Sequence, residues 1–364
     1  MPRYFFVAGE SSGDAHGAAL IAALRARAPE VVCEGLGGPR MAAAGMALRH
    51  DLASEAIMGF TEVVKHLPAI RRLFHETVAH LRATRPDALV LVDYPGFNIR
   101  LARAAHALGI RVVYYIGPQV WAWKKGRIRT LAECVDKMLV IFPFEEAIYK
   151  NAGMDCVYVG HPLIERVAAF RPGRVFEGAP VIGILPGSRA QEIARLLGPM
   201  LETARVLRET YPGAVFATPC VDRARADQIR ALAGGFPLEI VPGGMYDVLH
   251  AARGVLVASG TATLEGALFH TPMALMYRVS PLTYALARAL VDIEYIGIVN
   301  ILAGRGVAPE FIQEKIVPTE IAATMRVLLE DTPERAAMLE AFCAIEAQLG
   351  GEGASDRAAK EILM

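Results

Sequence analysis

Residues 88–98 read ALVLVDYPGFN, and this stretch decides the fold class. A continuous apolar run ends at Asp93, and Pro95 and Gly96 then favour a turn before a helical pattern begins. A short apolar run that ends in a turn is typical of a strand buried on both faces of a parallel sheet. The stretch therefore predicts one strand, its loop and the start of the next helix.

The same pattern recurs along the whole chain in two groups of five runs. Longer stretches with helical spacing separate the runs, as in βαβ units. The other runs are Tyr4–Ala8, Val112–Ile116, Met138–Ile141, Val157–Val159, Val181–Leu185, Ala214–Thr218, Leu238–Val241, Val255–Ala258 and Met273–Met276. We therefore predict an α/β protein with two similar parallel sheets.

The length of 364 residues also favours two domains, since a domain usually has about 100 to 200 residues. Residues 170–180 lack periodicity and contain Pro172, Gly173, Gly178 and Pro180, so we place the linker there. We expect an N-terminal domain at 1–168, a C-terminal domain at 175–340 and a separate terminal helix at 341–364.

Composition excludes several classes of protein. Lys plus Arg and Asp plus Glu both number 38, so no overall positive field favours nucleic acid. Five scattered cysteines without a C-x-x-C pair indicate a reducing cytosol, without disulfides or structural zinc. No apolar run reaches the roughly 18 residues of a membrane span. Because 54% of the residues are hydrophobic, we expect some exposed apolar surface. If the protein meets a membrane, it does so from the cytosolic side, without crossing it.

Ligands of open α/β sheets bind beyond the carboxyl ends of the strands, so the loop after each run is a candidate site. The first loop, residues 9–14, reads GESSGD. It resembles a phosphate-binding turn but lacks G-x-G-x-x-G and a Walker lysine. A tight turn with Asp14 as helix N-cap would explain Gly13 and Asp14 equally well. It would not explain Glu10, an acid at a strand end.

Asp93 follows its strand directly. An aspartate there is either a cap or a general base within reach of a substrate hydroxyl. Because Pro95 and Gly96 make a turn before the helix, Asn98 can cap that helix instead, which leaves Asp93 for chemistry.

The loop at residues 117–125, GPQVWAWKK, holds both tryptophans of the chain beside two lysines. One interpretation is a packed loop with a basic edge. The other is a wall for a sugar or acyl substrate that carries a phosphate.

Two loops of the second half have the composition of a diphosphate site. Residues 185–189, LPGSR, lead into a helix, where backbone N–H groups and the Arg189 guanidinium favour an anion. Residues 258–265, ASGTATLE, repeat this design, and Glu265 could accept hydrogen bonds from the hydroxyls of a ribose. Each loop read alone is also an ordinary helix cap.

Residues 58–74 combine apolar side chains at helical spacing with four basic residues. Such a stripe usually packs in a core, but its basic side would suit an anionic membrane surface. Pro68 would break the segment into two pieces that lie flat. The apolar residues that we expect to contact membrane or acyl chains are Met58, Phe60, Val63, Val64, Leu67 and Ile70.

Other catalytic motifs are missing. The sequence contains neither a G-x-S-x-G elbow nor H-E-x-x-H, and its histidines are isolated. The Asp-x-Asp clamp that usually holds a metal on nucleotide sugars is also missing. We therefore expect a mechanism without metal or cofactor.

Eight motifs together resemble the lipid A disaccharide synthase family and follow its order over nearly the whole chain. They are residues 9–14 (GESSGD), 38–41 (GPRM), 93–98 (DYPGFN), 120–123 (VWAW), 142–145 (FPFE), 185–189 (LPGSR), 258–262 (ASGTA) and 300–305 (NILAGR). The resemblance implies a GT-B glycosyltransferase, with two Rossmann-like domains facing across a cleft and the last helix returning to the first domain.

The resemblance also implies the reaction. UDP-2,3-diacylglucosamine gives its sugar to 2,3-diacylglucosamine 1-phosphate, forming a β-1,6 disaccharide and UDP, and the product is the precursor of lipid A in Gram-negative outer membranes. It implies a cytoplasmic enzyme, peripheral on the inner membrane, and leaves a homodimer open.

Carried over by position, the essential aspartate of the family falls on Asp93, its first-loop acid on Glu10 and the arginine of its LPGSR motif on Arg189. Asn300 matches the asparagine of the N-L-L-A-G-R motif, here followed by isoleucine. Gly96 stands where some members have an acid. The full set of expected substrate contacts is Ser12, Gly13, Asp14, Gly187, Ser188, Arg189, Ser259, Gly260, Thr261, Glu265, Arg278 and Asn300.

Inversion at the sugar needs a base on the acceptor and a stabilised leaving group. We expect Asp93 to be the base, with Glu10 as the rival, and Arg189 with two helix starts to stabilise UDP. The alternatives are a UDP-GlcNAc epimerase, a soluble N-acetylglucosaminyl transferase, a nucleotide-binding module without chemistry and a dinucleotide oxidoreductase.

Overall fold

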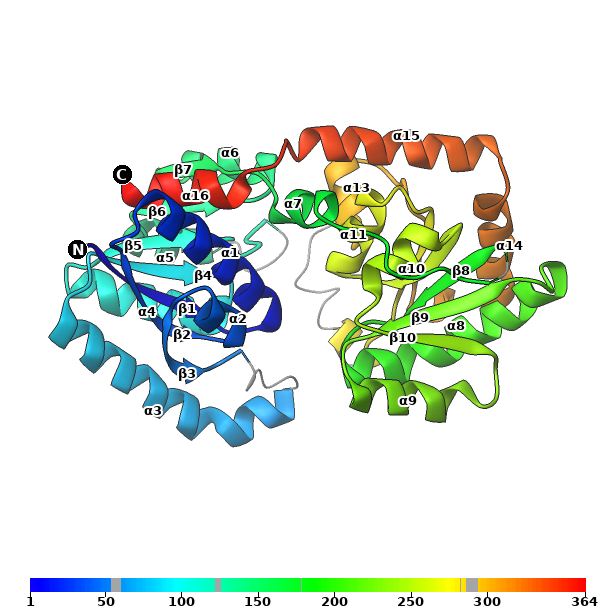
Figure 1. Cartoon of the computed structure of the whole chain (residues 1–364), viewed down its shortest axis with the longest axis horizontal. Helices are drawn as coiled ribbons and strands as arrows, with labels where there is room; N and C mark the ends of the chain where they lie inside the picture. The colour runs from blue at the N-terminus through cyan, green and yellow to red at the C-terminus, as the bar shows by residue number, and fades with distance from the viewer. Residues whose placement is uncertain (54–59, 122–125, 178, 282, 286–293) are drawn as a thin grey trace. The chain divides into compact units, whose positions relative to one another are not determined.

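The computed structural model describes residues 1–364 apart from 54–59, 122–125, 178, 282 and 286–293 (Figure 1). The chain forms two compact units. Unit 1 contains Met1–Glu165 and Leu349–Met364, and unit 2 contains Arg166–Gln348. Residues 166–168 and 341–348, which the sequence analysis gave to the first domain and to the terminal helix, therefore lie in unit 2.

Unit 1 is a parallel sheet in the order β3-β2-β1-β4-β5-β6-β7, with helices on both faces. Its central strands β1 and β4 are almost wholly buried, as continuous apolar runs require. The strands are β1 (Arg3–Ala8), β2 (Val32–Gly37), β3 (Ala47–Asp51), β4 (Ala88–Val92), β5 (Arg111–Tyr115), β6 (Lys137–Val140) and β7 (Cys156–Tyr158). The helices are α1 (Ser11–Arg27), α2 (Pro39–Ala43), α3 (Phe60–Thr84), α4 (Pro95–Ala107), α5 (Arg127–Cys134), α6 (Pro143–Asn151) and α16 (Ala354–Leu363), and α7 (Pro162–Ala168) spans the boundary of the units.

Unit 2 repeats this design with a parallel sheet in the order β10-β9-β8-β11-β12-β13. The strands are β8 (Val181–Leu185), β9 (Val215–Cys220), β10 (Leu238–Pro242), β11 (Gly254–Ala258), β12 (Met273–Tyr277) and β13 (Glu310–Ile312). The helices are α8 (Ala190–Thr210), α9 (Arg223–Ala233), α10 (Met245–Ala251), α11 (Thr261–Leu268), α13 (Ile298–Ala303), α14 (Pro318–Leu329) and α15 (Pro333–Gln348), with a 3₁₀ turn at Gln313–Lys315. The two parallel, Rossmann-like sheets confirm the predicted fold class.

The strand order places the candidate loops. In unit 1 the chain moves outward from β1 to β3 and then returns to β4, so the order reverses between β1 and β4. In unit 2 it reverses between β8 and β11. Ligands of such sheets bind outside the carboxyl ends of the strands at these reversals. The loops after β1, β4, β8 and β11 are therefore the expected binding loops, and all four are among the loops that the sequence singled out.

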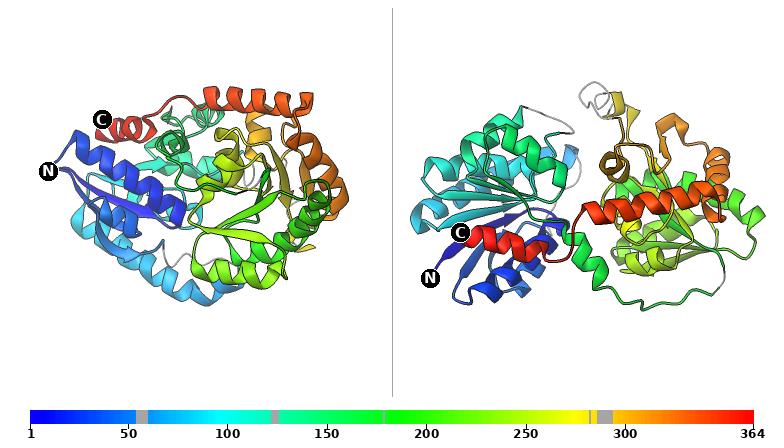
Figure 2. Two further views of the ribbon diagram at one scale, coloured as in Figure 1. Left: turned by 45° about the vertical axis from the view of Figure 1, so that its right-hand side comes forward. Right: turned by 90° about the horizontal axis from the view of Figure 1, so that it is seen from above.

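The C-terminal helix α16 belongs to unit 1, where it packs along α1 (Figure 2). Both oxygens of the Asp356 carboxylate accept hydrogen bonds from Arg27, at 2.6 and 2.5 Å. Arg111 donates to the carbonyl of Ile362 at 2.8 Å, and Lys137 pairs with Glu361 at 2.8 Å. The chain thus leaves unit 1 after Glu165 and returns to it at Leu349.

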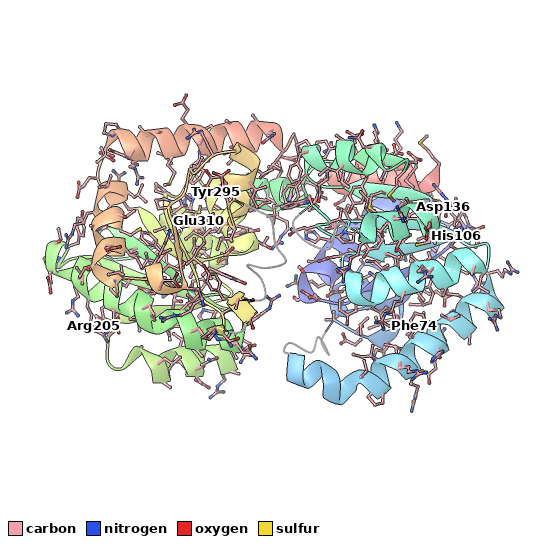
Figure 3. All side chains as sticks on the ribbon, turned by 180° about the vertical axis from the view of Figure 1, so that it is seen from behind. Phe74, His106, Asp136, Arg205, Tyr295 and Glu310 are labelled. Atoms are coloured by element: carbon pink, nitrogen blue, oxygen red, sulfur yellow. The ribbon has the colours of Figure 1, made fainter. Side chains whose placement is uncertain are left out.

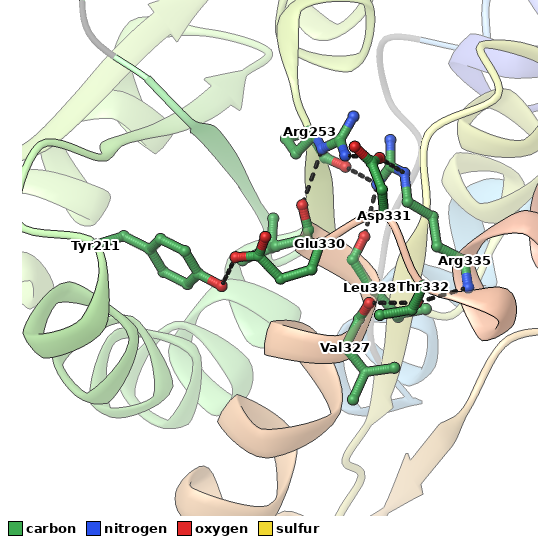
Figure 4. Close-up of polar contacts among 9 residues, drawn as sticks. Tyr211, Arg253, Val327, Leu328, Glu330, Asp331, Thr332 and Arg335 are labelled. Carbon is green, nitrogen blue, oxygen red and sulfur yellow. Dashed lines mark hydrogen bonds and ion pairs between the residues drawn. The ribbon is translucent and has the colours of Figure 1, made fainter.

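An arginine network closes the end of α14 in unit 2 (Figure 4). The buried Arg335 donates to the carbonyls of Arg253 and Leu328, at 2.8 and 2.6 Å. Arg253 donates to the carbonyl of Leu329 at 2.9 Å and pairs with Asp331. The last carbonyls of a helix have no partner within it, so this network satisfies them. It lies at the amino end of the sheet, opposite the binding loops.

Candidate active site

The loop after β4 in unit 1 has an unusual backbone. Asp93 and Tyr94 both have positive φ, 48° and 52°, in the left-handed region that residues other than glycine seldom adopt. The carbonyl of Asp93 accepts hydrogen bonds from Asn98 Nδ2 at 2.7 Å and Tyr114 Oη at 2.8 Å. Side chains from α4 and β5 therefore hold this conformation in place.

Asn98 does not cap α4, which corrects the sequence-based expectation. Its side-chain amide donates to carbonyls at the ends of β1 and β4, and the residue before α4 is Tyr94. The alternative interpretation of Asp14 as the N-cap of α1 is also wrong. Glu10 is the N-cap residue of α1, while the buried Asp14 carboxylate accepts hydrogen bonds from the backbone N–H of Arg40 at 3.1 Å and Met41 at 3.0 Å. Asp14 thus caps α2, in the GPRM motif, and Ser12 and Gly13 lie in the first turn of α1.

Glu10 and Asp93 meet across the reversal between β1 and β4. Burial, and then the negative charge of Glu10, raise the pKa of Asp93 to about 6. Gly9 allows the loops to approach, because a Cβ there would lie 2.3 Å from the ring of Tyr94. A carboxylate with a pKa near neutrality can accept a proton in the transition state and stay largely ionised at pH 7.

Glu145 is a buried acid that the sequence analysis did not select, although it lies in the FPFE motif. Its Oε1 accepts a hydrogen bond from Trp121 Nε1 at 3.0 Å, and its Oε2 accepts one from the backbone N–H of Phe142 at 3.3 Å. Burial raises the pKa of Glu145 to about 7. Phe144 also packs edge-on against Trp121. The hydrogen bond to Glu145 and this ring contact together fix the first tryptophan of the VWAW motif. Trp123 and both lysines of the loop lie outside the described residues.

The loop after β8 in unit 2 carries Arg189 at its end. Gly187 has a φ of 105°, and a Cβ there would lie 2.3 Å from a carboxylate oxygen of Glu192. Glu192 accepts hydrogen bonds from the backbone N–H of Arg189 at 3.2 Å and from its Nη1 at 3.1 Å. The helix begins at Ala190, so Ser188 lies in the turn that leads into it.

The loop after β11 leads directly into α11. Gly260 has a φ of 154°, and Thr261 is the first residue of the helix. Thr263 Oγ1 donates to the Gly260 carbonyl at 2.8 Å, and Ser259 Oγ donates to the Ile296 carbonyl at 3.2 Å. The turn therefore presents backbone N–H groups at a helix start, as an anion site requires.

Glu265 of α11 interacts with Tyr246 and Arg166, which also belong to unit 2. It accepts a hydrogen bond from Tyr246 Oη at 3.1 Å. Burial raises the pKa of Glu265, while Arg166 and Tyr246 lower it. The Arg166 guanidinium also lies 5.6 Å from the centre of the Tyr246 ring. Sequence reasoning missed Arg166 and Tyr246, since neither lies in a recognisable motif.

Asn300 is fully buried, and the chain itself uses its whole hydrogen-bonding capacity. Its Oδ1 accepts from the backbone N–H of Val307 and Ala308, both at 2.8 Å. Its Nδ2 donates to the Ala308 carbonyl and to Glu310, again both at 2.8 Å. An amide has two donors and two acceptor positions, so none remains for a ligand. Glu310 in turn accepts from the backbone N–H of Gly297 at 2.9 Å, so Asn300 fixes the segment that bonds Ser259; Glu310 is labelled in Figure 3.

Arg278 lines a pocket of about 590 Å³ beside β12 and β13, together with Arg195, Tyr284 and Gln313. Burial raises the pKa of Tyr277, at the end of β12, and the positive charges of Arg189 and Arg195 oppose this. Arg189 and Arg195, six residues apart in the chain, are thus both close enough to Tyr277 to affect its pKa.

The expectations for the apolar stripe at 58–74 have different outcomes. Helix α3 runs from Phe60 to Thr84 with Pro68 inside it, so the expected break at the proline is wrong. Ile70 packs in part against the core of unit 1, whereas Leu67 is 52% exposed. Met58 and the side chains of Phe60, Val63 and Val64 lie outside the description.

Among the residues that the structure describes, no helix is both long and apolar enough to cross a membrane. Nor do three or more histidine, cysteine, aspartate or glutamate side chains of the described ranges gather where they could hold a metal ion.

Solved structures with the same fold include enzymes that handle UDP-sugars. The UDP complex of MnaA from S. aureus has a TM-score of 0.67 at 12% identity, and covers 100% of this chain and 96% of its own. The glycotransferase of kitacinnamycin has a TM-score of 0.65 at 17% identity, and covers 100% of this chain and 98% of its own. At such low identity the likeness shows the fold alone, a GT-B fold with two Rossmann-like units.

Some curated relatives are much more similar to this chain in sequence than these solved structures are. Lipid-A-disaccharide synthase from Syntrophus aciditrophicus is 43% identical over 364 residues, covering 97% of this chain and 95% of the relative. The synthase from Myxococcus xanthus is 40% identical over 372 residues, covering 100% of this chain and 97% of the relative. The family model for lipid-A-disaccharide synthetase matches residues 4–360. The chain therefore belongs to the lipid-A-disaccharide synthetase family and is a glycosyltransferase that acts on a sugar nucleotide and a lipid.

Proposed function

We propose that this glycosyltransferase inverts the donor sugar, with Asp93 as the base that deprotonates the 6-hydroxyl of 2,3-diacylglucosamine 1-phosphate. The observation that carries the proposal is the position of Asp93, buried beside Glu10 at the reversal of the unit 1 sheet, with its pKa raised to about 6. General base catalysis contributes about 10²- to 10⁴-fold when the pKa of the base lies near the working pH.

The step is a single displacement. The acceptor O6 attacks C1 of the glucosamine in UDP-2,3-diacylglucosamine, a new C1–O6 bond forms and the bond from C1 to the diphosphate oxygen breaks. The hydroxyl proton goes to Asp93, and UDP leaves with the electron pair. Because the donor is α-linked and the product β-linked, one such step accounts for the change of configuration. Glu10 is the rival base, since it lies close enough to Asp93 to raise its pKa.

Unit 2 would stabilise the leaving UDP without a metal. Arg189 supplies a guanidinium, and the turns at Ser188 and at Gly260–Thr261 supply backbone N–H groups at the starts of α8 and α11. Glu265, which accepts a hydrogen bond from Tyr246, would also accept hydrogen bonds from the two ribose hydroxyls. Arg278 would contact the diphosphate or the donor sugar from the pocket beside β12.

We further propose that α3, around the exposed Leu67, seats the enzyme on the cytoplasmic face of the inner membrane, where both lipid substrates reside. Leu67 projects from this part of the helix, while Ile70 and Phe74 turn towards the core; Phe74 packs edge-on against Phe97 with ring centres 5.8 Å apart (Figure 3). The basic residues between the apolar ones would contact anionic headgroups.

The test is release of UDP from UDP-2,3-diacylglucosamine, measured with and without the acylated sugar phosphate. We expect release only when the acceptor is present, and a disaccharide with a β-1,6 bond. Asp93→Ala should lower turnover by about 10²- to 10⁴-fold and leave UDP binding intact. Undiminished turnover of this variant would remove Asp93 from the role, and the same loss in Glu10→Gln alone would transfer the role to Glu10.

A further inference from the structure

The backbone at Asp93 and Tyr94 has an unusual conformation. Two successive residues with side chains have positive φ, 48° and 52°, in a region that costs energy for most residues other than glycine and that Asp and Asn enter a little more readily. Such a conformation persists only where the surroundings determine it, and it gathers at functional sites. The contacts that hold it are therefore informative about the site.

Two buried polar side chains converge on one atom, the carbonyl oxygen of Asp93. Asn98 Nδ2 lies 2.7 Å from it and Tyr114 Oη lies 2.8 Å from it. Both residues are fully buried, with 0% of their surface exposed. On the other side of the residue, the backbone N–H of Asp93 donates to the carbonyl of Tyr115 at 3.1 Å. Both backbone polar groups of Asp93 are thus fixed, and with them the direction in which its carboxylate leaves the main chain.

We propose that Tyr114 and Asn98 are positioning residues for Asp93, which set its carboxylate against the acceptor hydroxyl by holding the left-handed backbone at residues 93 and 94. This inference rests on the proposed role of Asp93 as the base. Burial raises the pKa of Tyr114 well above its usual value, so its hydroxyl keeps the proton that it donates. Neither residue touches substrate in this account, because the hydrogen bonds go to the main chain.

If the same hydrogen bonds had a purely structural role, a different result would be expected. Loss of a buried hydrogen bond would then lower stability and leave the folded enzyme with unchanged turnover. A misplaced base instead lowers kcat and leaves substrate affinity intact, because the ground-state contacts are elsewhere. It also alters the acid limb of the pH profile, because a looser loop admits water and lowers the pKa of the carboxyl.

Tyr114→Phe is the direct test, since it removes only the hydroxyl oxygen. We expect kcat to fall roughly 10- to 100-fold, with KM for donor and acceptor nearly unchanged and with the acid limb moved to lower pH. The matched control is Tyr115→Phe, the next residue of β5, whose side chain points to the other sheet face beside Ser355 and Arg357. It should keep the wild-type kcat and pH profile. Asn98→Leu, which deletes the second donor, should repeat the kcat loss.

A double-mutant cycle separates this inference from the proposed function. If Tyr114 acts through Asp93, Tyr114→Phe should cause no further loss in an Asp93→Asn background. A wild-type kcat and pH profile in both Tyr114→Phe and Asn98→Leu would overturn the inference, even if Asp93→Asn is inactive. A further full loss in the Asp93→Asn background would overturn it too. Full turnover of Asp93→Asn itself would overturn the proposed function instead.

Discussion

Arg189 and Glu192 form an ion pair over the turn that is proposed to bind diphosphate. The guanidinium Nη1 lies 3.1 Å from Glu192 Oε1, and the backbone N–H of Arg189 donates to Glu192 Oε2 at 3.2 Å. The carboxylate therefore occupies two of the groups that an incoming phosphate would use. This relationship gives two predictions, one for each partner.

The first concerns Arg189→Ala. Removing one preorganised cation from the leaving group should lower kcat by roughly 10²- to 10³-fold, as for other single donors to a developing negative charge. Arg205→Ala, at an exposed position on the same helix, should leave turnover unchanged (Figure 3). EDTA should have little effect on the wild type. Strong inhibition by EDTA that magnesium or manganese reverses would show that a metal performs the work assigned to Arg189.

The second concerns Glu192→Gln. Because the exposed pair with Arg189 is worth only about 0.2 to 1 kcal/mol, its loss should release the guanidinium from Glu192 at small cost. With one negative charge fewer beside the diphosphate, UDP should bind about two- to fivefold more tightly in calorimetric titration. Weaker binding of UDP to this variant would mean that Glu192 instead holds Arg189 in its binding position.

The stability of unit 1 should depend on pH through Asp93. Its folded pKa of about 6 lies above the usual 3.8, so the folded state favours the protonated carboxyl. The stabilisation is therefore full below pH 3.8 and is lost as the pH rises through 6. Asp93→Asn, which removes this penalty, should raise the free energy of unfolding at pH 7.5 by up to about 3 kcal/mol, with no gain at pH 3.5.

Urea unfolding followed by tryptophan fluorescence measures this effect in the right unit, because Trp121 and Trp123 are the only tryptophans of the sequence and both belong to unit 1. An Asp93→Asn variant that is less stable than wild type at pH 7.5 would show that the Asp93 carboxylate is satisfied rather than strained.

The membrane proposal is tested with Val63→Ser, Val64→Ser and Leu67→Ser in one protein. The triple variant should move from the membrane fraction to the soluble fraction and keep its folded circular dichroism spectrum. Ile70 is left unchanged, because it packs partly against the core and its loss would destabilise unit 1. Leu232→Ser is the control, since Leu232 is 46% exposed on α9 of unit 2. Unfolding of the triple variant would assign the stripe to the core.

The sequence predicts the strands that are continuous apolar runs, because burial on both faces leaves a pattern that composition alone reveals. It misses β2, where Glu34 and two glycines dilute the run, and the polar edge strand β3, whose sequence is ALRHD. It misses β13 as well, because three residues at a sheet edge carry too little signal. These strands are recognised only by pairing with a neighbour that is distant in the chain.

The candidate site, like the set of strands, can be predicted only in part from the sequence. Glu10, Asp93 and Arg189 stand out because each follows a buried run. Tyr114 lies inside a strand that reads as pure core, and its hydroxyl reaches Asp93 only through the pairing of β4 with β5. Tyr246 approaches Glu265 in the same way, from a helix 19 residues earlier. Residues that the fold brings together from distant parts of the chain cannot be recognised as partners from the local sequence.

Measuring kcat/KM against pH, for wild type, Asp93→Asn and Glu10→Gln, tests most directly whether Asp93 is the base. With wild type the rate should fall below an apparent pKa near 6, the value that burial and Glu10 give to Asp93. Asp93→Asn should lose roughly 10²- to 10⁴-fold with UDP affinity unchanged, whereas Glu10→Gln should stay active and shift the limb to lower pH. A limb near pH 6 that survives in Asp93→Asn, with turnover intact, would contradict the account.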